Sequence, residues 1–307
     1  MNVVRGHQQA PEWPAAAVAI GNFDGVHLGH RALVARAREL AIAHGARTVV
    51  LTFDPHPAQV LAPQAAAPRV CSLDRRLELL ADAGADAVVV EPFTRELAGL
   101  APDAFVDDVV LGALRARAIV VGYDFNYGQN RAGTIETLRA HGLRAGVEIA
   151  IVPAVEVAGE IASSSRIRGY LKSGELAAAA RLLGRPWDVD GVVVHGAKRG
   201  RAIGVPTANI AADIALPIAP GIYAVTLAAE GVTRAAVASL GTNPTFVEQG
   251  TLTLEVHVLD WEGDLYDRRV RVTFVARLRD ELKFDSIEAL TDQIRTDIEQ
   301  AREALRR

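Results

Sequence analysis

The sequence predicts two domains: an α/β domain with a Rossmann-like parallel sheet, followed by a small antiparallel β-barrel that carries a C-terminal helix. Three observations predict this. Before Leu183, apolar runs alternate with amphipathic segments, as in a parallel sheet covered on both faces. After Leu183 the hydrophobic pattern changes to alternation at every second residue. The 307 residues also suffice for two cores, which we assign to residues 1–183 and 184–307.

The first domain is expected to gather its loops at one edge of the sheet. Apolar runs predict strands at residues 15–20, 47–53, 87–90, 118–121 and 147–152. Helices are expected after His30 and at residues 74–83, 102–114, 134–141 and 175–183, with a loop at 62–68. Ligands of such sheets lie at the carboxyl ends of the strands, so the loops that begin at Gly21, Asp54 and Gly122 are the candidate ligand-binding loops.

The second domain shows the alternation of half-buried antiparallel strands. These strands are expected at residues 191–195, 222–228, 233–240, 251–259 and 268–275, and such a set suggests a closed barrel. Asp285 and Glu288 fit a capping box at the start of the last helix. One apolar stripe of that helix is expected to pack on the barrel: Ile287, Leu290, Ile294, Ile298, Ala301 and Leu305.

The composition excludes several classes of function. A formal net charge of −4 argues against nucleic-acid binding, because such proteins are usually basic. The single Cys71 excludes an intramolecular disulfide and a cysteine metal cluster. No signal peptide is expected, and no apolar run reaches the roughly 18 residues of a membrane span. We therefore expect a cytoplasmic protein whose partners are small molecules, with no membrane partner; a weak homo-oligomer is left open.

Residues 21–30 read Gly-Asn-Phe-Asp-Gly-Val-His-Leu-Gly-His and join the first strand to the first helix. His27 and His30 lie at the start of that helix, where free N–H groups and the helix dipole favour an anion. A glycine-rich turn could merely close a helix. A nucleotide-phosphate site is nevertheless favoured by the combination of the strand, the three glycines, Asp24 and the helix. The stretch resembles the signature of the nucleotidyltransferase superfamily, whose His-x-Gly-His motif handles ATP phosphates.

A second phosphate-binding pattern lies at residues 163–168, Ser-Ser-Ser-Arg-Ile-Arg. Serine is a common helix cap, so a capped and solvated helix start is the simple interpretation. Capping accounts for one serine and not for three followed by two arginines. Hydroxyl, N–H and guanidinium groups at one helix start suit a triphosphate.

The barrel carries a third pattern. The basic loop 198–204 leads into Val-Pro-Thr-Ala-Asn, in which Thr207 and Asn209 offer two neutral oxygen ligands for Mg²⁺. Glu255 lies on the polar face of its strand with Thr253 and His257. Alternation alone leaves open whether Glu255 is a solvated carboxylate or a general base beside a bound triphosphate.

The barrel motifs resemble the flavokinase family, in which the Pro-Thr-Ala-Asn motif binds Mg²⁺-ATP and a strand glutamate is the base. Following a nucleotidyltransferase domain, they resemble the prokaryotic bifunctional riboflavin kinase/FAD synthetase family. The resemblance covers residues 15–302 and includes Arg-Leu-Arg-Asp-Glu-Leu-Lys-Phe at 277–284. It implies two ATP-dependent steps: the C-terminal domain phosphorylates riboflavin to FMN, and the N-terminal domain adenylylates FMN to FAD with release of pyrophosphate.

The resemblance also implies roles for individual residues. The catalytic residues would be His27, His30 and Glu255. Mg²⁺ would be bound, together with ATP, by Thr207 and Asn209. The flavin contacts would be Asp124, Phe125, Arg279 and Phe284. The ATP and phosphate contacts would be Gly21, Phe23, Asp24, Gly29, Ser163, Ser164, Ser165, Arg168, Gly204, Thr207 and Asn209.

The chain departs from the family pattern at five positions. Tyr127 replaces a common phenylalanine. Asn126 replaces a common arginine and so removes a cation from the first site. Ser165 replaces threonine and keeps the hydroxyl. Ser239 and Thr242 replace the commoner asparagine and basic residue of the barrel. None of these changes removes a proposed catalytic group.

Three rival functions are weighed against this one. A riboflavin kinase with a decayed first domain would not need His27, His30 and Arg168. A transferase for another phosphate substrate leaves the kinase motif of the barrel without a role. A flavin sensor that lacks catalysis would need no base at Glu255.

Overall fold

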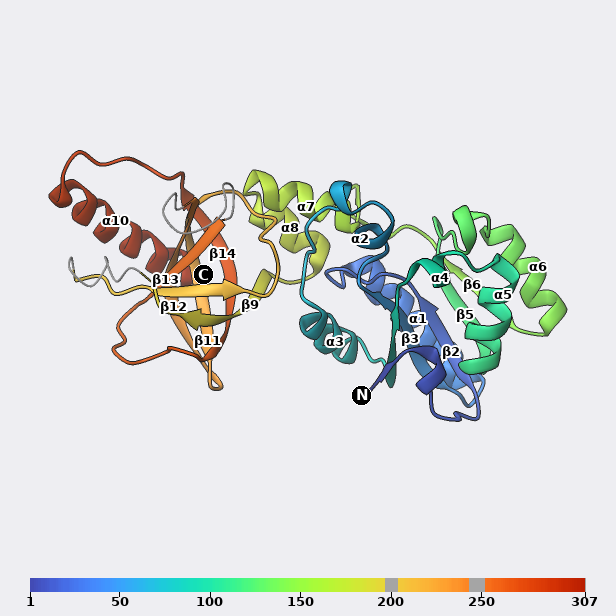
Figure 1. The fold of residues 1–307 in the computed structure, drawn as a ribbon. Helices are drawn as coiled ribbons and strands as arrows, with labels where there is room; N and C mark the ends of the chain where they lie inside the picture. Colours follow the sequence, from blue (N-terminus) through green and yellow to red (C-terminus); the bar gives the residue numbers. More distant parts are fainter. Residues whose placement is uncertain (197–203, 243–251, 307) are drawn as a thin grey trace. The chain divides into compact units, whose positions relative to one another are not determined.

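The protein is described by a computed structural model that places residues 1–196, 204–242 and 252–306 (Figure 1). The chain forms two compact units. The first unit contains Met1–Ala67 and Leu73–Ala162, and the second contains Pro68–Ser72 and Ser163–Arg307. The chain therefore passes from one unit to the other three times.

The first unit is built on a six-stranded parallel sheet, as the sequence predicts. Its edge strand β1 was not anticipated, because four residues at the start of the chain carry too little pattern to be recognised. In sheet order the strands are β1 (Asn2–Arg5), β4 (Ala87–Pro92), β3 (Arg47–Asp54), β2 (Ala16–Ile20), β5 (Ala116–Gly122) and β6 (Glu148–Val152).

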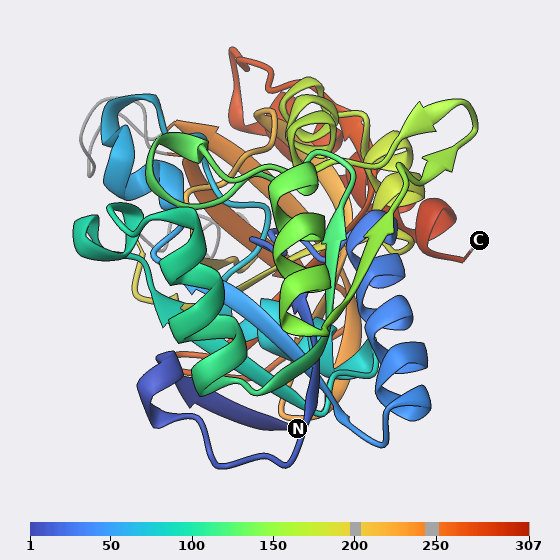
Figure 2. The same ribbon diagram turned by 90° about the vertical axis from the view of Figure 1, so that its right-hand side faces the viewer.

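Helices cover both faces of this sheet (Figures 1 and 2). The apolar sides of α1 (Leu28–Ala43) and α3 (Leu73–Asp82) pack on one face. The other face is covered by η3 (Phe105–Ala113), which winds as a π-helix, and by α6 (Ile135–Ala145). The shorter elements are η1 (His7–Gln9), α2 (Pro57–Leu61), η2 (Pro63–Ala65), α4 (Arg95–Ala98), α5 (Pro102–Ala104), η4 (Gln129–Arg131), β7 (Glu156–Val157) and β8 (Glu160–Ile161).

The strand order fixes where a ligand can bind. From β2 the chain moves through β3 to β4, and it then crosses back to form β5 on the other side of β2. Ligands of open parallel sheets bind at such a reversal, outside the carboxyl ends of the strands. The loops that follow Ile20, Asp54 and Gly122 all begin at this edge, as predicted.

The second unit is a closed six-stranded antiparallel barrel followed by a helix, as predicted. In barrel order its strands are β10 (Ala208–Ala212), β13 (Leu252–Val258), β12 (Val232–Thr242), β11 (Gly221–Ala229), β14 (Arg269–Arg279) and β9 (Trp187–Val194). Two helices, α7 (Ser164–Ser173) and α8 (Leu176–Leu183), precede the barrel, and α10 (Ile287–Leu305) follows it. Strand β10 was missed because its alternation is masked by small residues after Pro206.

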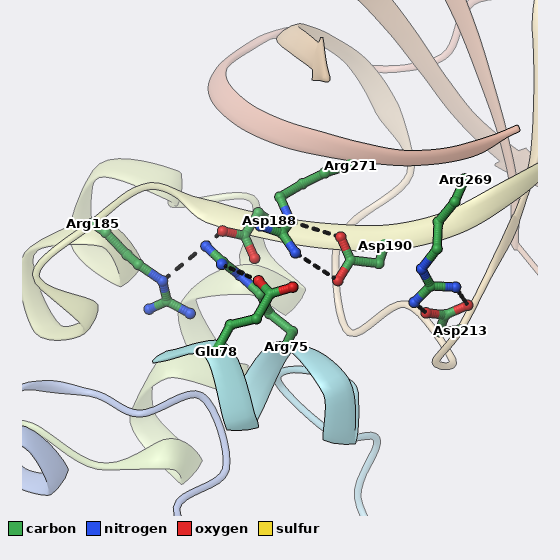
Figure 3. A network of polar contacts seen from close by, with 8 residues as sticks. All are labelled: Arg75, Glu78, Arg185, Asp188, Asp190, Asp213, Arg269 and Arg271. Atoms are coloured by element: carbon green, nitrogen blue, oxygen red, sulfur yellow. Dashed lines mark hydrogen bonds and ion pairs between the residues drawn. The ribbon is translucent and has the colours of Figure 1, made fainter. Parts of the chain in front are cut away.

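Buried aromatic rings and ion pairs stabilise the barrel. The Trp187 ring lies 5.0 Å from that of Phe274, and its Nε1–H donates to the Val70 carbonyl at 2.8 Å. Outside the core, Arg271 binds the carboxylate of Asp190 through two hydrogen bonds of 2.7 and 3.1 Å (Figure 3). This pair joins two neighbouring strands, β14 and β9.

Helix α10 packs on β11, β12 and β14, but two details differ from the prediction. Its cap is Ser286, whose side chain accepts the Ala289 N–H, so the capping box at Asp285 was wrong by one residue. Ile287 is 65% exposed in the first turn, whereas the rest of the stripe is at least half-buried. No helix in the described parts of the chain is both long and apolar enough to cross a bilayer.

Candidate functional site

The turn between β2 and α1 is tight and strained. Phe23 and Val26 have φ angles of 52° and 42°, in the left-handed region that a β-branched side chain rarely adopts. Both side chains are fully buried, so packing holds the backbone in this form. Strain of this kind is typical of sites where the backbone must approach a ligand.

The turn brings His27 and His30 together at the start of α1. His27 is the N-cap, and its Nδ1 accepts the His30 N–H at 3.4 Å, so a neutral His27 carries its proton on Nε2. The two rings stack with centroids 3.6 Å apart, and Phe23 lies 5.1 Å from His30. Gly29 leaves the room for this, because a Cβ there would lie 3.0 Å from the His27 ring.

Burial controls the charge of both imidazoles. It lowers the pKa of His27 from 6.5 to about 4. It also lowers the pKa of His30 well below 6.5, and the charges of His27 and Arg76 lower it further. Both rings are therefore neutral at pH 7. A phosphate bound beside them would favour their protonated forms and raise both pKa values.

Arg76 is a residue of this region that the sequence analysis missed. It lies on α3, is completely buried, and donates from Nη1 to Thr52 Oγ1 at 3.3 Å and to the Phe53 carbonyl at 3.0 Å. Thr52 in turn donates to the Asn22 carbonyl at 3.1 Å. Arg76 is thereby linked through the end of β3 to the turn that carries the histidines. Asp24, in the same turn, is also buried.

The loop after β5 combines an exposed acid with a stacked aromatic pair. Asp124 is exposed, and its carbonyl accepts a hydrogen bond of 2.9 Å from the Asn126 side chain. Phe125 stacks on Tyr127 with centroids 5.5 Å apart. The amide of Asn126 therefore supports the loop itself, whereas an arginine there would supply a cation.

The serine–arginine stretch begins α7 in the second unit. Ser163 is the N-cap and accepts the Arg166 N–H at 3.3 Å, which confirms the predicted capping. The Arg168 Nη1 lies 3.5 Å from Ser165 Oγ. The preceding residue, Ala162, belongs to the first unit, and its carbonyl oxygen would lie 3.4 Å from a Cβ on Gly29. The stretch thus leaves the first unit from the start of α1.

Three predicted residues of the barrel lie together: Asn209 on β10, Glu255 on β13, and Thr207 just before β10. Asn209 is paired directly with Glu255, and Ser239 of β12 faces Glu255 from the other side. The Thr207 hydroxyl donates to Glu255 Oε2 at 3.1 Å. Gly204 has a φ of 76°, and no atom of the described residues would lie within 4 Å of a Cβ there. The rest of the basic loop, 198–203, and the Thr242 side chain lie outside the described residues.

Arg279 and Phe284 also lie together, but the arginine has a structural partner. Its guanidinium binds both carboxylate oxygens of Asp297 on α10, at 2.8 and 2.7 Å. Its Cζ lies 5.9 Å from the centroid of the Phe284 ring. Arg279 therefore connects the end of β14 to α10 and to the phenylalanine.

Comparison with known proteins identifies the family. The family model described as FAD synthetase matches residues 9–166, and that described as riboflavin kinase matches residues 183–305. A bifunctional riboflavin kinase/FMN adenylyltransferase of Pseudomonas fluorescens is 38% identical over 303 residues, covering 98% of this chain and 97% of that protein. The protein of the same name from Escherichia coli K12 is 36% identical over 306 residues, covering 99% of this chain and 97% of that protein.

The similarity extends to three dimensions. A crystal structure titled macrolide-efflux protein from Streptococcus pneumoniae has a TM-score of 0.87 and 31% sequence identity, covering 98% of this chain and 99% of that one. Fold and site together define a two-part phosphate-transfer enzyme, with a nucleotidyltransferase unit and a kinase barrel. The chain belongs to the bifunctional riboflavin kinase/FMN adenylyltransferase family, as its motifs predict, with the FAD synthetase part first.

Proposed function

We propose that this chain makes FAD from riboflavin in two ATP-dependent steps, one at each cluster described above. One observation supports this division most directly. The paired histidines and the Thr207–Asn209–Glu255 cluster belong to different compact units, and each cluster has groups suited to phosphate chemistry. The order of the two units matches the order of the two family models. We assign adenylyl transfer to residues 1–183 and phosphorylation to residues 184–307.

The barrel phosphorylates riboflavin. Glu255 accepts the proton of the ribityl hydroxyl, whose oxygen attacks the γ-phosphorus of ATP while the bond to ADP breaks. The hydrogen bond from Thr207 keeps this carboxylate in place. Thr207 and Asn209 carry the side-chain oxygens that would hold Mg²⁺, which supplies charge neutralisation when it is bound with ATP. The described residues contain no cluster of three acidic, histidine or cysteine ligands, and Mg²⁺ needs few protein ligands.

The first unit transfers AMP to FMN. A phosphate oxygen of FMN attacks the α-phosphorus of ATP, and the bond to pyrophosphate breaks. His27 and His30 donate hydrogen bonds to the triphosphate, together with the N–H groups of Gly29 and its neighbours at the start of α1. Gly21, Phe23 and Asp24 shape the turn beneath it.

Further contacts complete the site. The triphosphate is also bound by the residues at the start of α7, which are Ser163, Ser164, Ser165 and Arg168. The flavin is contacted by Asp124 and Phe125.

The flavin site of the barrel and the cellular setting complete the proposal. Phe284, held beneath the Arg279 guanidinium, contacts the flavin of the kinase site. The protein acts in the cytoplasm on small molecules, with no nucleic-acid or membrane partner. A weak homo-oligomer is compatible with this function and is not required by it.

Two single variants test the division of labour. In His30→Ala, FMN should accumulate from riboflavin, ATP and Mg²⁺ without FAD. In Glu255→Ala, riboflavin should stay unchanged while supplied FMN still becomes FAD. The flavins are separated by chromatography over time. Loss of both activities in either folded variant would contradict the assignment of one site to each unit.

The same assay on the unmodified chain separates the rival functions. FMN that rises and then gives way to FAD supports the bifunctional enzyme. FMN that only accumulates would indicate a decayed first unit and direct attention to Asn126. Flavin binding without any new flavin would indicate a sensor. Turnover of another phosphate substrate in place of FMN would indicate a different transferase.

A further inference from the structure

The guanidinium of Arg76 lacks the partners that a buried cation needs. The side chain is 0% exposed, and its Nε and Nη2 have no hydrogen-bond partner among the residues that the structure describes. Within those same residues, no carboxylate forms an ion pair with it; its contacts are Thr52 Oγ1 and the Phe53 carbonyl. Burying a charge without a counter-ion is costly, so a group absent from the chain itself is expected to balance it.

The place of Arg76 indicates which group that is. Its Nη1 reaches the last residues of β3, at the edge of the sheet where the strand order reverses. Its charge acts on His30, whose own Nδ1 is buried and has no hydrogen-bond partner in the described chain. Two groups with unsatisfied nitrogens therefore belong to one region: His30 lies in the first turn of α1, and Arg76 is linked through Thr52 to the turn that leads into that helix. A guanidinium, an imidazole and a helix start together form a site for a phosphate group.

We propose that Arg76 is a phosphate-binding residue of the adenylyl-transfer site and shares the triphosphate of ATP with His30. The proposal rests on the adenylyl-transfer function given above. His27 and His30 are both neutral at pH 7 and bring no positive charge to an incoming triphosphate. Arg76 supplies that charge. The simple alternative is that Arg76 only supports Thr52 and the turn.

The test replaces Arg76 with methionine, which keeps the length and removes the charge. We expect kcat/KM for ATP in FMN adenylylation to fall about 10- to 100-fold, the range for lost hydrogen bonds to a charged group. Riboflavin phosphorylation, measured on the same preparation, should stay within about twofold and reports only that the barrel is folded. Folding of the first unit is checked by the ring signals of His27 and His30 in the ligand-free variant, which should match those of the unmodified chain. Arg36→Met, which removes a half-exposed arginine of α1 that pairs with Glu39, is the matched control and should leave both rates unchanged.

A binding measurement separates this proposal from the function on which it rests. Inorganic tripolyphosphate is titrated into the unmodified chain and into Arg76→Met while the ring signals of His27 and His30 are followed by NMR. We expect tripolyphosphate to shift these signals in the unmodified chain. In Arg76→Met its affinity should be weaker by about tenfold or more. Arg76→Lys, which keeps a cation, should recover part of the affinity and is used in place of methionine if that variant fails to fold.

The outcomes are distinct. If the unmodified chain makes no FAD but Arg76 still governs tripolyphosphate binding, the proposed reaction fails and the phosphate site stands. If FAD is made and the folded variant has unchanged kcat/KM for ATP and unchanged tripolyphosphate affinity, Arg76 is a structural residue and the proposal is overturned.

Discussion

His27 and His30 show how burial prepares side chains for an anion. Their pKa values are lowered, mainly by desolvation, so the two rings, stacked 3.6 Å apart, are neutral at pH 7. Two imidazolium ions at that distance would repel each other strongly. At the ATP site that we propose, a bound triphosphate would offset this repulsion and favour the protonated rings.

The lowered pKa of His27 predicts a pH-dependent stability. The unfolded chain binds a proton near pH 6.5 and the folded chain only near pH 4, so this contribution is complete above 6.5 and decreases as the pH falls. Between pH 7.5 and 5 it amounts to about 2 kcal/mol of unfolding free energy. Urea titrations should show the unmodified chain losing that much more than His27→Gln. Equal losses would mean that His27 titrates normally.

Arg76 shows what a residue pattern hides. In α3 it stands three residues after Leu73 and three and four residues before Leu79 and Leu80, and therefore on the apolar face of the helix. That spacing is the signal that could have revealed it. It was missed because arginine is usually exposed. Only the folded chain shows that β3 offers it a carbonyl and a hydroxyl, and that no carboxylate among the described residues forms an ion pair with it.

At the scale of elements, hydrophobic periodicity was sufficient to predict a strand or helix wherever its residues are buried in a regular pattern. The central strand β2 is uniformly apolar because both faces of the sheet are covered there, and β13 alternates because only one of its faces is buried. Strand β10 was missed since its residues are small and follow Pro206, yet it carries Asn209. Thr207, Asn209 and Glu255 were all named from the sequence, whereas the pairing of Asn209 with Glu255 follows from the barrel register, which depends on distant contacts.

The attachment of α10 depends on one buried ion pair. Asp297 is nearly inaccessible and binds Arg279 through two hydrogen bonds. Asp297→Ala leaves the guanidinium half of a buried pair uncompensated, and we expect a loss of about 3–5 kcal/mol in unfolding free energy. Asp292→Ala, on the same helix, breaks an exposed pair with Arg295 and should cost less than about 1 kcal/mol. Thermal unfolding of both variants makes the comparison; similar losses would show that α10 is held by its apolar contacts alone.

At the scale of the whole chain, the compact units and the change of sequence pattern do not coincide. Periodicity changes near Leu183, but α7 and α8 belong with the barrel. Helix α8 packs on β9 and β14 and buries Leu182 and Leu183 completely. A helix between two domains has the same pattern whichever one it packs against, so the sequence could not decide this point.

A comparison of two fragments tests this attachment. A fragment that begins at Ser163 keeps α7 and α8, whereas one that begins at Gly184 lacks both. Each buried leucine contributes on the order of 2 kcal/mol, so the shorter fragment should unfold at a clearly lower temperature. Calorimetric melting of the two fragments gives the result. Equal melting temperatures would mean that both helices contribute nothing to the barrel.

The segment Pro68–Ser72 is synthesised long before the part of the chain that it packs with. It belongs to the second unit, and the Val70 carbonyl accepts its hydrogen bond from Trp187, 117 residues later in the chain. A ribosome adding about 5–20 residues per second needs about 6–23 seconds to cover that interval. During that time the sheet of the first unit can assemble around a loop whose partner does not yet exist. The Val70 carbonyl is therefore synthesised well before its hydrogen-bond donor, and the contact with Trp187 can form only after most of the first unit has been made.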